Sequence, residues 1–249
     1  MEVWVQWRGQ QWRVQRAQPL SIAIPLRADG AVPNAFFLRQ PEFQPVRIGS
    51  FVGSVAQGGS CNCQDVTFNP HGNGTHTECL GHITAEPLTI AEALTCFLFI
   101  AQLISVQPRQ LPNGDQVIAV DDLPPLEEGI EAVVVRTLPN GDEKLTRQYS
   151  GTNPPYVLPE TAAFFRDFGI QHFLIDLPSM DREDDGGKLL AHRAFWHYPE
   201  QPRRNATITE MVYVPNAIAD GIYMLELQVP AFALDAAPSR PVLYPMESI

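Results

Sequence analysis

The chain has 249 residues, of which 45% are hydrophobic and 18% charged, and 17 basic against 28 acidic residues give a net charge of −11. This composition is typical of a globular protein with a sizeable core. The acidic balance and the lack of Lys or Arg runs exclude nucleic acid and anionic membranes as expected partners, because both are recognised by clustered basic residues.

The first residues, MEVWVQWRGQ, lack the basic and apolar regions of a signal peptide. The most apolar stretch, ALTCFLFIAQLI (93–104), is too short for a membrane span of about 20 residues. We therefore expect a cytoplasmic protein that does not enter a membrane. The four cysteines (Cys61, Cys63, Cys79 and Cys96) show no Cys-x-x-Cys spacing, and we expect no disulfides in this compartment.

The first half of the chain predicts mainly strands. Apolar and polar residues alternate on both sides of Gly9-Gln10, which predicts a β-hairpin that extends the domain over about residues 1–16. SIAIPL (21–26) predicts a short strand, whereas residues 27–60 are expected to be irregular. TIAEALTCFLF (89–99), opened by Thr89, predicts a short helix, and IAQLISV (100–106) a buried strand.

The second half interleaves strands with one clear helix. LPNGD occurs at 111–115 and 138–142, but the flanking sequences differ, so two turns are expected rather than a repeat. PETAAFFRDFG (159–169) has the proline and glycine that begin and end a helix. Strands are expected at VVVRT (133–137), HFLIDLP (172–178), MVYVPN (211–216) and GIYMLELQVPAF (221–232). The pattern predicts one α/β domain over residues 1–249 with a mixed sheet.

The stretch NPHGNGTHTECLGH (69–82) contains three of the six histidines. Its glycines disfavour a helix, and its histidine gaps of five and six residues do not match the i, i+4 spacing of helical zinc motifs. In an extended chain, alternate residues share a face, so His76, Glu78 and His82 would face one side, and the glycine-rich turn can fold His71 back toward them. Imidazole and carboxylate ligands suit zinc, manganese or iron(II).

Further polar residues downstream are candidates to complete a metal shell. His192 follows an apolar pair, and Glu210 precedes the apolar run MVYV. Taken alone, each of these two residues is more simply explained as a surface residue, and the acidic run REDDGG (182–187) is most simply a solvated loop. Cys79 has the wrong parity for the histidine face, so burial is its expected role.

Several segments in order resemble one family. GTHTECLGH (74–82) resembles the motif His-x-Gly-Thr-His-x-Asp-x-Pro-x-His of the cyclase or kynurenine formamidase (arylformamidase) family of metal-dependent hydrolases. The resemblance continues through VVVRT, LPETAAFFRDFG, HFLIDLPSMD, LLAHRAFW and TEMV, and covers roughly residues 17 to 245. It implies an α/β domain of the swivelling β/β/α type, a homodimer or homotetramer, and one or two zinc or manganese ions.

The resemblance also implies roles for single residues. His76 would be a ligand of one metal, Glu78 would bridge two metals, and His192 and Glu210 would be the distal ligands. His82 would be the catalytic proton donor and acceptor. The family's first histidine falls at Gly72, one residue after His71, which must be brought back into register to act as a ligand. Glutamate at position 78 replaces aspartate and Leu80 replaces proline, which predicts a divergent subgroup.

The implied activity is hydrolysis of a small amide C–N bond, as in the conversion of an N-formyl aromatic amide to formate and an amine in tryptophan catabolism. Asp176, Ser179 and Asp181 are expected to orient ligands or substrate. Phe36 and Phe37 are expected either to cover an aromatic substrate or simply to pack. Two alternatives stay open: an isatin hydrolase-like, lactone or cyclic-amide hydrolase of the same family, and a non-catalytic metal-binding protein on the same scaffold.

Overall fold

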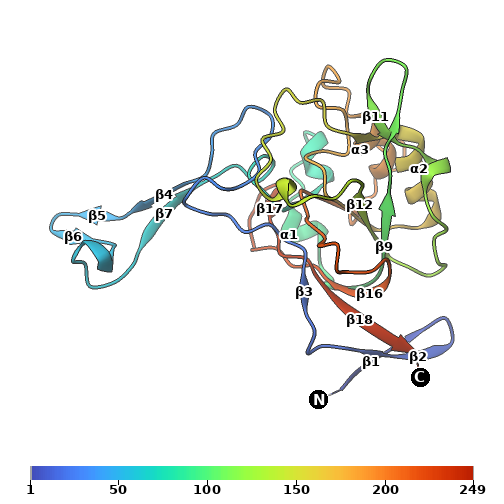
Figure 1. Cartoon of the computed structure of the whole chain (residues 1–249), viewed down its shortest axis with the longest axis horizontal. Coiled ribbons are helices and arrows are strands. Elements are labelled where there is room, and N and C mark those ends of the chain that lie inside the picture. The colour runs from blue at the N-terminus through green and yellow to red at the C-terminus, as the bar shows by residue number, and fades with distance from the viewer. Residues whose placement is uncertain (1, 249) are drawn as a thin grey trace.

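The computed structural model describes residues 2–248, which are organised around a large mixed sheet (Figure 1). In spatial order its strands are β1 (Val3–Trp7), β2 (Gln10–Val14), β18 (Val242–Ser248), β16 (Gly221–Glu226), β9 (Leu98–Val106), β12 (Ala132–Thr137), β14 (His172–Ile175), β15 (Thr207–Glu210), β8 (His76–Cys79) and β17 (Ala236–Pro238), with β3 (Leu20–Ser21) beside β18. The central strands β9, β12, β14 and β15 are parallel, and the outer pairs are antiparallel. This arrangement confirms the predicted mixed α/β fold.

Helices and loops cover both faces of the sheet. Along β12, Val133 and Val135 pack with the side chains of α2 (Pro159–Phe168) and α3 (Leu190–Trp196), while Ala132 and Val134 pack on the opposite face near α1 (Ile90–Ala93). All four side chains are fully buried. Strand side chains alternate between faces, so a continuous apolar run is the pattern of a strand covered on both sides.

The smaller elements connect this sheet to its surroundings. They are β10 (Arg109–Gln110), β11 (Gln116–Ile118) and β13 (Tyr156–Val157), which form a small sheet, and the 3-10 turns η2 (Leu80–Ile83), η3 (Val120–Asp122) and η4 (Asp142–Leu145). Cys79 is buried as predicted, and the other three cysteines are exposed. Within residues 2–248, the helices are too short or too polar to cross a membrane.

An arm formed by residues 41–68 extends away from the body of the molecule (Figure 1). It contains two short antiparallel ladders, β4 (Glu42–Pro45) with β7 (Gln64–Thr67), and β5 (Arg47–Ile48) with β6 (Phe51–Val52). The 3-10 turn η1 (Val55–Gln57) lies between β6 and β7. The expectation that residues 27–60 are irregular is therefore wrong for this segment. Its strands bury no face against a core, so the apolar alternation that signals a strand is weak.

Three other sequence predictions need correction. The helix expected over 89–99 has one turn, Ile90–Ala93, capped by Thr89, and Leu98 already begins β9. The strand expected over 211–216 is a buried loop, because Met211 adopts a positive φ of 52° that ends β15. In the segment 21–26, only Ser21 belongs to a strand.

Candidate metal centre

The histidine cluster lies where the parallel strands of the sheet end. Glu210 is the last residue of β15, and His76, the first residue of β8, lies directly opposite it in the antiparallel ladder. The loop after β14 carries Ser179 and Asp181 toward the same point. Ligand sites in α/β sheets occur at the carboxyl ends of parallel strands, because loops from several strands converge there.

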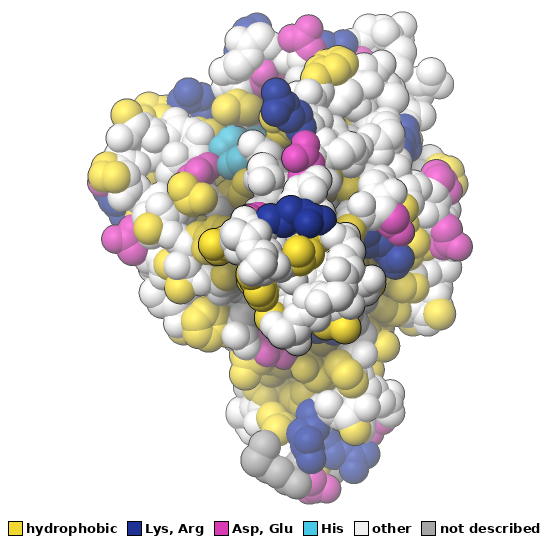
Figure 2. Space-filling model, turned by 90° about the vertical axis from the view of Figure 1, so that its left-hand side faces the viewer, with side chains coloured by type: hydrophobic (Ala, Val, Ile, Leu, Met, Phe, Trp, Pro, Cys, Tyr) yellow, Lys and Arg dark blue, Asp and Glu magenta, His cyan; other side chains and the backbone are white. Residues whose placement is uncertain are grey.

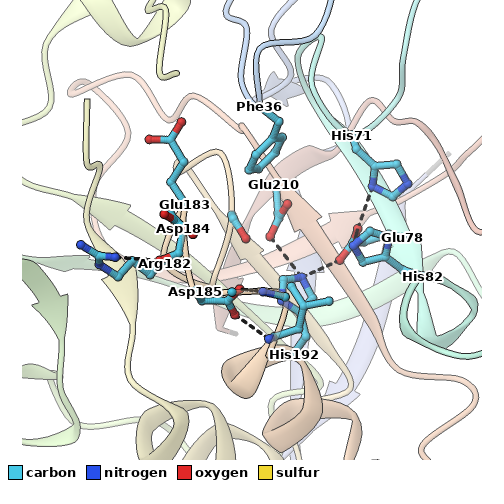
Figure 3. Close-up of a pocket in the computed structure, with 14 residues that line it drawn as sticks. Phe36, His71, Glu78, His82, Arg182, Glu183, Asp184, Asp185, His192 and Glu210 are labelled. Atoms are coloured by element: carbon cyan, nitrogen blue, oxygen red, sulfur yellow. Dashed lines mark hydrogen bonds and ion pairs between the residues drawn. The ribbon is translucent and has the colours of Figure 1, made fainter. Parts of the chain in front are cut away.

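Glu78 is the centre of this cluster (Figure 3). Its side chain is buried, with Oε1 2.9 Å from Nε2 of His192 and Oε2 3.1 Å from Nδ1 of His71. Nε2 of His82 lies 3.8 Å from the same Oε2. Glu78 lies between Ile208 of β15 and Ala236 of β17 in the sheet, so pairing on both sides fixes its backbone. Three imidazoles therefore converge on one carboxylate.

The glycine-rich turn before β8 brings His71 into the cluster despite its shifted register. The Oδ1 atom of Asn69 accepts the backbone N–H of His71 at 3.0 Å, and Oδ1 of Asn73 accepts the backbone N–H of Asn69 at 2.7 Å. Gly74 has a φ of 105°, which a residue with a side chain rarely adopts. The extra residue is thus accommodated in the turn, and His71, His76 and Glu78 have ligand atoms close enough to share one ion.

His82 reaches the cluster by a different route from the one predicted. The strand ends at Cys79, so His82 does not continue the alternating face of His76 and Glu78 but lies on the 3-10 turn η2. Gly81 permits this turn, because a Cβ there would lie 2.0 Å from the carbonyl oxygen of Leu88. The residues converge as expected, but by turn geometry rather than by strand parity.

Two histidines have their outer nitrogen held by an acceptor. Nδ1 of His192 lies 2.5 Å from Oδ2 of Asp181, and Nδ1 of His76 lies 3.0 Å from the backbone oxygen of Gly74. Each acceptor requires the proton on Nδ1, which leaves Nε2 directed at the acidic groups: His192 toward Glu78, and His76 toward Glu210. This arrangement is the usual one around protein metals, whose histidine ligands donate their second N–H to a carboxylate or carbonyl.

Asp235 is the acceptor that holds the outer nitrogens of His71 and His82. Its Oδ2 atom lies 2.9 Å from Nε2 of His71 and 3.3 Å from Nδ1 of His82, on the side of both rings away from Glu78. Sequence reasoning missed Asp235. It stands alone in AFALDAAPSR (231–240), more than 150 residues from the motif, and its surroundings there carry no recognisable pattern. Only the pairing of β17 with β8 brings it to the cluster.

His76 supplies the clearest test of whether these residues fit a cation. Its Nε2 atom is buried and has no hydrogen-bond partner among the described residues, and the nearest acidic oxygen, Oε2 of Glu210, lies 3.5 Å away. Leaving a buried polar atom without a partner costs about 1–3 kcal/mol. A buried imidazole nitrogen that has no hydrogen-bond partner and lies beside two carboxylates suits a divalent cation, so the donor set fits a metal.

The charged groups strongly perturb each other. Burial lowers the pKa of His71, but hydrogen bonds to Asp235 and Glu78 outweigh burial and raise it to about 10. Burial also lowers the pKa of His192, but the hydrogen bonds to Asp181 and Glu78 outweigh burial and raise this pKa well above its usual value. Burial opposes ionisation of Glu78, but its charge interaction with His82 and its hydrogen bonds with His192 and His71 keep its pKa well below the ordinary range. In the metal-free protein the cluster therefore holds protons that a cation would displace.

A cavity of about 350 Å³ opens onto this cluster (Figure 3). Its lining comprises Phe36, His71, Glu78, His82, Ser179, Arg182, Glu183, Asp184, Asp185, Gly186, Gly187, Leu189, His192 and Glu210. Phe36 faces the centre, whereas Phe37 is 81% exposed and lies outside the lining. The run REDDGG, which is expected to be only a solvated loop, forms the acidic rim of the cavity.

The three downstream candidates separate into different environments. Ser179 lines the cavity, and Asp181 binds His192. Asp176 belongs elsewhere: it is buried, accepts hydrogen bonds from the backbone and hydroxyl of Thr137, and pairs with Lys144 at 2.7 Å. The expectation that Asp176 orients ligands has no contact to support it, because its carboxylate is used in joining β12 to the loop after β14.

Comparisons with known proteins agree with this architecture. The Cyclase family model ("Putative cyclase") matches residues 6–182. A kynurenine formamidase from Bacillus cytotoxicus is 25% identical over 193 residues, 76% of this chain and 83% of that protein. A predicted metal-dependent hydrolase from Bacillus stearothermophilus superimposes with a TM-score of 0.63 at 17% identity, covering 91% of this chain and 98% of the other. Isatin hydrolase A from Labrenzia aggregata gives 0.63 at 11% identity, covering 91% and 93%.

Proposed function

This chain belongs to the Cyclase family, and from that premise we propose that it is a metal-dependent hydrolase that cleaves the C–N bond of a small amide. The observation that carries the proposal is the unpartnered Nε2 of His76, in a cluster where three further imidazoles face Glu78. We propose His71, His76, Glu78, His192 and Glu210 as ligands of one or two zinc or manganese ions.

The proposed mechanism divides the work between the ion and the chain. A bound divalent cation lowers the pKa of water to about 7 and polarises a carbonyl group. His82 would take the proton of the attacking water on Nε2 and return it to the leaving nitrogen, so that a formamide and water yield formate and an amine. Asp181 supports this chemistry by fixing the ring of His192.

The size and lining of the cavity support a small aromatic amide as substrate. A volume of about 350 Å³ lies near the lower end of the range for small-molecule sites. Phe36 can pack on an aromatic ring while the amide faces the cluster. The kynurenine formamidase relative supports an N-formyl aromatic amide in particular. A cytoplasmic location and a role in tryptophan catabolism are further parts of this proposal.

Two other functions fit fewer observations. An isatin hydrolase-like, lactone or cyclic-amide hydrolase is supported by the fold that the chain shares with isatin hydrolase A. A non-catalytic metal-binding protein would need the ligands but not His82, whose Nε2 lies 3.8 Å from Glu78 and beside the cavity. His82→Ala separates these functions: we expect metal content to be retained and hydrolysis to fall at least a hundredfold, the lower end of the usual contribution of general acid–base catalysis.

One combined experiment tests the proposed function. The metal content of the purified protein is measured, and the protein is then assayed on an N-formyl aromatic amide, isatin and a small lactone after zinc or manganese is added. Bound metal with hydrolysis of the formamide supports the proposal, and preference for isatin or the lactone favours the alternative enzyme. If no metal binds and none of the probes is hydrolysed, the enzyme proposal is wrong.

A further inference from the structure

Asp235 is held beside the cluster by backbone pairing on both sides. Its carbonyl oxygen accepts the N–H of Cys79 at 3.0 Å, and the preceding carbonyl, that of Leu234, accepts the N–H of Ile90 at 2.7 Å. The next residue, Ala236, pairs with Glu78 in the sheet. The backbone at residue 235 is therefore fixed relative to the centre of the site.

The carboxylate of Asp235 contacts two imidazoles through one oxygen. Oδ2 lies 2.9 Å from Nε2 of His71 and 3.3 Å from Nδ1 of His82. The two rings are stacked, with centroids 4.3 Å apart and planes 28° from parallel. Their opposite nitrogens lie 3.1 Å and 3.8 Å from Oε2 of Glu78. The two histidines thus run side by side between Asp235 and Glu78.

This arrangement fixes which nitrogen of His82 carries the proton. A carboxylate accepts a hydrogen bond, so Nδ1 of His82 carries a proton, and in the neutral ring the lone pair is on Nε2, toward Glu78. The other tautomer would direct an N–H at the cavity and would be unable to accept a proton from water. The same oxygen holds His71 so that its Nδ1 faces Glu78.

We propose that Asp235 is a positioning residue that keeps Nε2 of His82 free to accept a proton and directs Nδ1 of His71 at the metal centre. This inference rests on the proposed hydrolase function. Asp235 lies 2.9 Å and 3.3 Å from ring nitrogens that face away from Glu78, so its contribution passes through the two histidines rather than through a contact with substrate. Through these two contacts, Asp235 of the C-terminal region acts on the histidine motif in the first third of the chain.

The kinetic test compares Asp235→Asn and Asp235→Glu with the wild type, using whichever of the N-formyl aromatic amide, isatin and lactone probes the wild type hydrolyses. We expect Asp235→Asn to lower kcat about 10- to 100-fold, the usual cost of losing a residue that orients a histidine. KM should change less than about threefold, because substrate contacts are kept, and Asp235→Glu should restore part of kcat. Asp167→Asn, an exposed site at the end of α2, is the control.

Two further measurements do not depend on activity. At saturating zinc, metal content per chain should be the same in Asp235→Asn and the wild type. In zinc-loaded protein with 15N-labelled histidine, long-range 1H–15N spectra should show His82 with the proton on Nδ1 in the wild type. In Asp235→Asn, part of the population should carry the proton on Nε2, because a neutral amide accepts a hydrogen bond more weakly than a carboxylate.

The outcomes separate the two proposals. Loss of a bound ion from Asp235→Asn at saturating zinc would make Asp235 a ligand rather than a positioning residue. An unchanged kcat with an unchanged tautomer would show that it has no positioning role. Either result overturns the inference. If the wild type binds zinc but hydrolyses no probe, the proposed hydrolysis fails, and the tautomer of His82 still decides the role of Asp235. A shifted tautomer with lowered kcat and unchanged metal content supports both.

Discussion

His76 and Glu210 lie directly opposite each other, the first residue of β8 paired with the last residue of β15. Their side chains are almost completely buried, with Nε2 and Oε2 3.5 Å apart. Sheet pairing fixes this spacing before a metal binds, so His76 and Glu210 are preorganised. The entropic cost of ordering the two side chains is therefore met during folding and does not weaken metal binding.

Glu210→Gln tests this pair. The amide keeps the size of the side chain and can still accept the N–H of Met180, which Oε1 of Glu210 accepts at 2.8 Å, but it removes the negative charge. We expect zinc affinity to fall at least about tenfold, since even residues that only orient ligands contribute 10- to 100-fold. Competition with a chromogenic chelator measures this affinity, and exposed Glu160→Gln is the control. Equal affinities in the variant and wild type would remove Glu210 from the ligand set.

Metal binding should release protons at neutral pH. The pKa of His71 is raised to about 10 and that of His192 well above its usual value, so both rings are protonated in the metal-free protein at pH 7.5. A cation that takes their inner nitrogens must displace about two protons, and apparent affinity should rise about 10- to 100-fold per pH unit between pH 7 and 9. Calorimetry in buffers of different ionisation enthalpy counts the protons. Affinity that is constant over this range would contradict the ligand roles of these two rings.

His172 should make the fold sensitive to acid independently of the metal centre. It is 3% exposed, and burial, with Arg203 nearby, lowers its pKa to about 3. In the unfolded chain His172 binds a proton below about pH 6.5, whereas in the folded chain it stays neutral down to about pH 3. The free energy of unfolding therefore decreases as the pH falls from about 6.5 toward 3. We expect a loss approaching about 1.4 kcal/mol per pH unit below pH 5.5.

His172→Asn provides the comparison for this pH dependence. The asparagine amide can keep the hydrogen bond that joins Nδ1 of His172 to the Thr207 hydroxyl at 2.8 Å, but it does not titrate. Urea unfolding at pH 7.5 and 5.0 should show a smaller loss of stability in the variant than in the wild type, because every other titrating group is common to both. The same loss in both proteins would show that His172 does not contribute.

The arm of residues 41–68 should be buried in the predicted homodimer or homotetramer. Only three of its residues are charged, a smaller fraction than the 18% of the whole chain. The apolar residues Ile48, Val55 and Val66 are 71%, 55% and 45% exposed. Viewed end-on, it shows mainly apolar and uncharged surface (Figure 2). A two-stranded hairpin without a core is marginally stable alone, and depletion of charge is typical of the buried centre of an interface.

Truncation of the arm tests this expectation. Gln44 and Asp65 are cross-strand partners, so joining them through an Asn-Gly turn removes residues 45–64 without changing the register of the remaining pairs. We expect the wild type to have the mass of two or four chains in size-exclusion chromatography with light scattering, and the truncated chain to have a smaller mass. A monomeric wild type, or an unchanged mass after truncation, would contradict a role for the arm in assembly.

Local patterns predicted the regular elements well where the sequence carried two agreeing signals. The helix Pro159–Phe168 has a proline at its start, a glycine at its end and a buried apolar stripe, and its bounds were correct to one residue. The strand β12 was identified from a run of β-branched residues. The run 211–216 carried only the apolar signal, and it is a loop because buried loops need apolar side chains as much as strands do.

The sequence by itself determined the mixed α/β fold and the family, because periodicity, caps and motif order are properties of residues near each other in the chain. The tertiary structure decided which side chains meet. It brought His71 back to Glu78 through the turn at Gly74, placed Asp176 with Lys144 rather than at the cavity, and added Asp235. The position of Asp235 depends on the pairing of β17 with β8, which joins residues about 160 positions apart, and no local pattern specifies the partner of a strand.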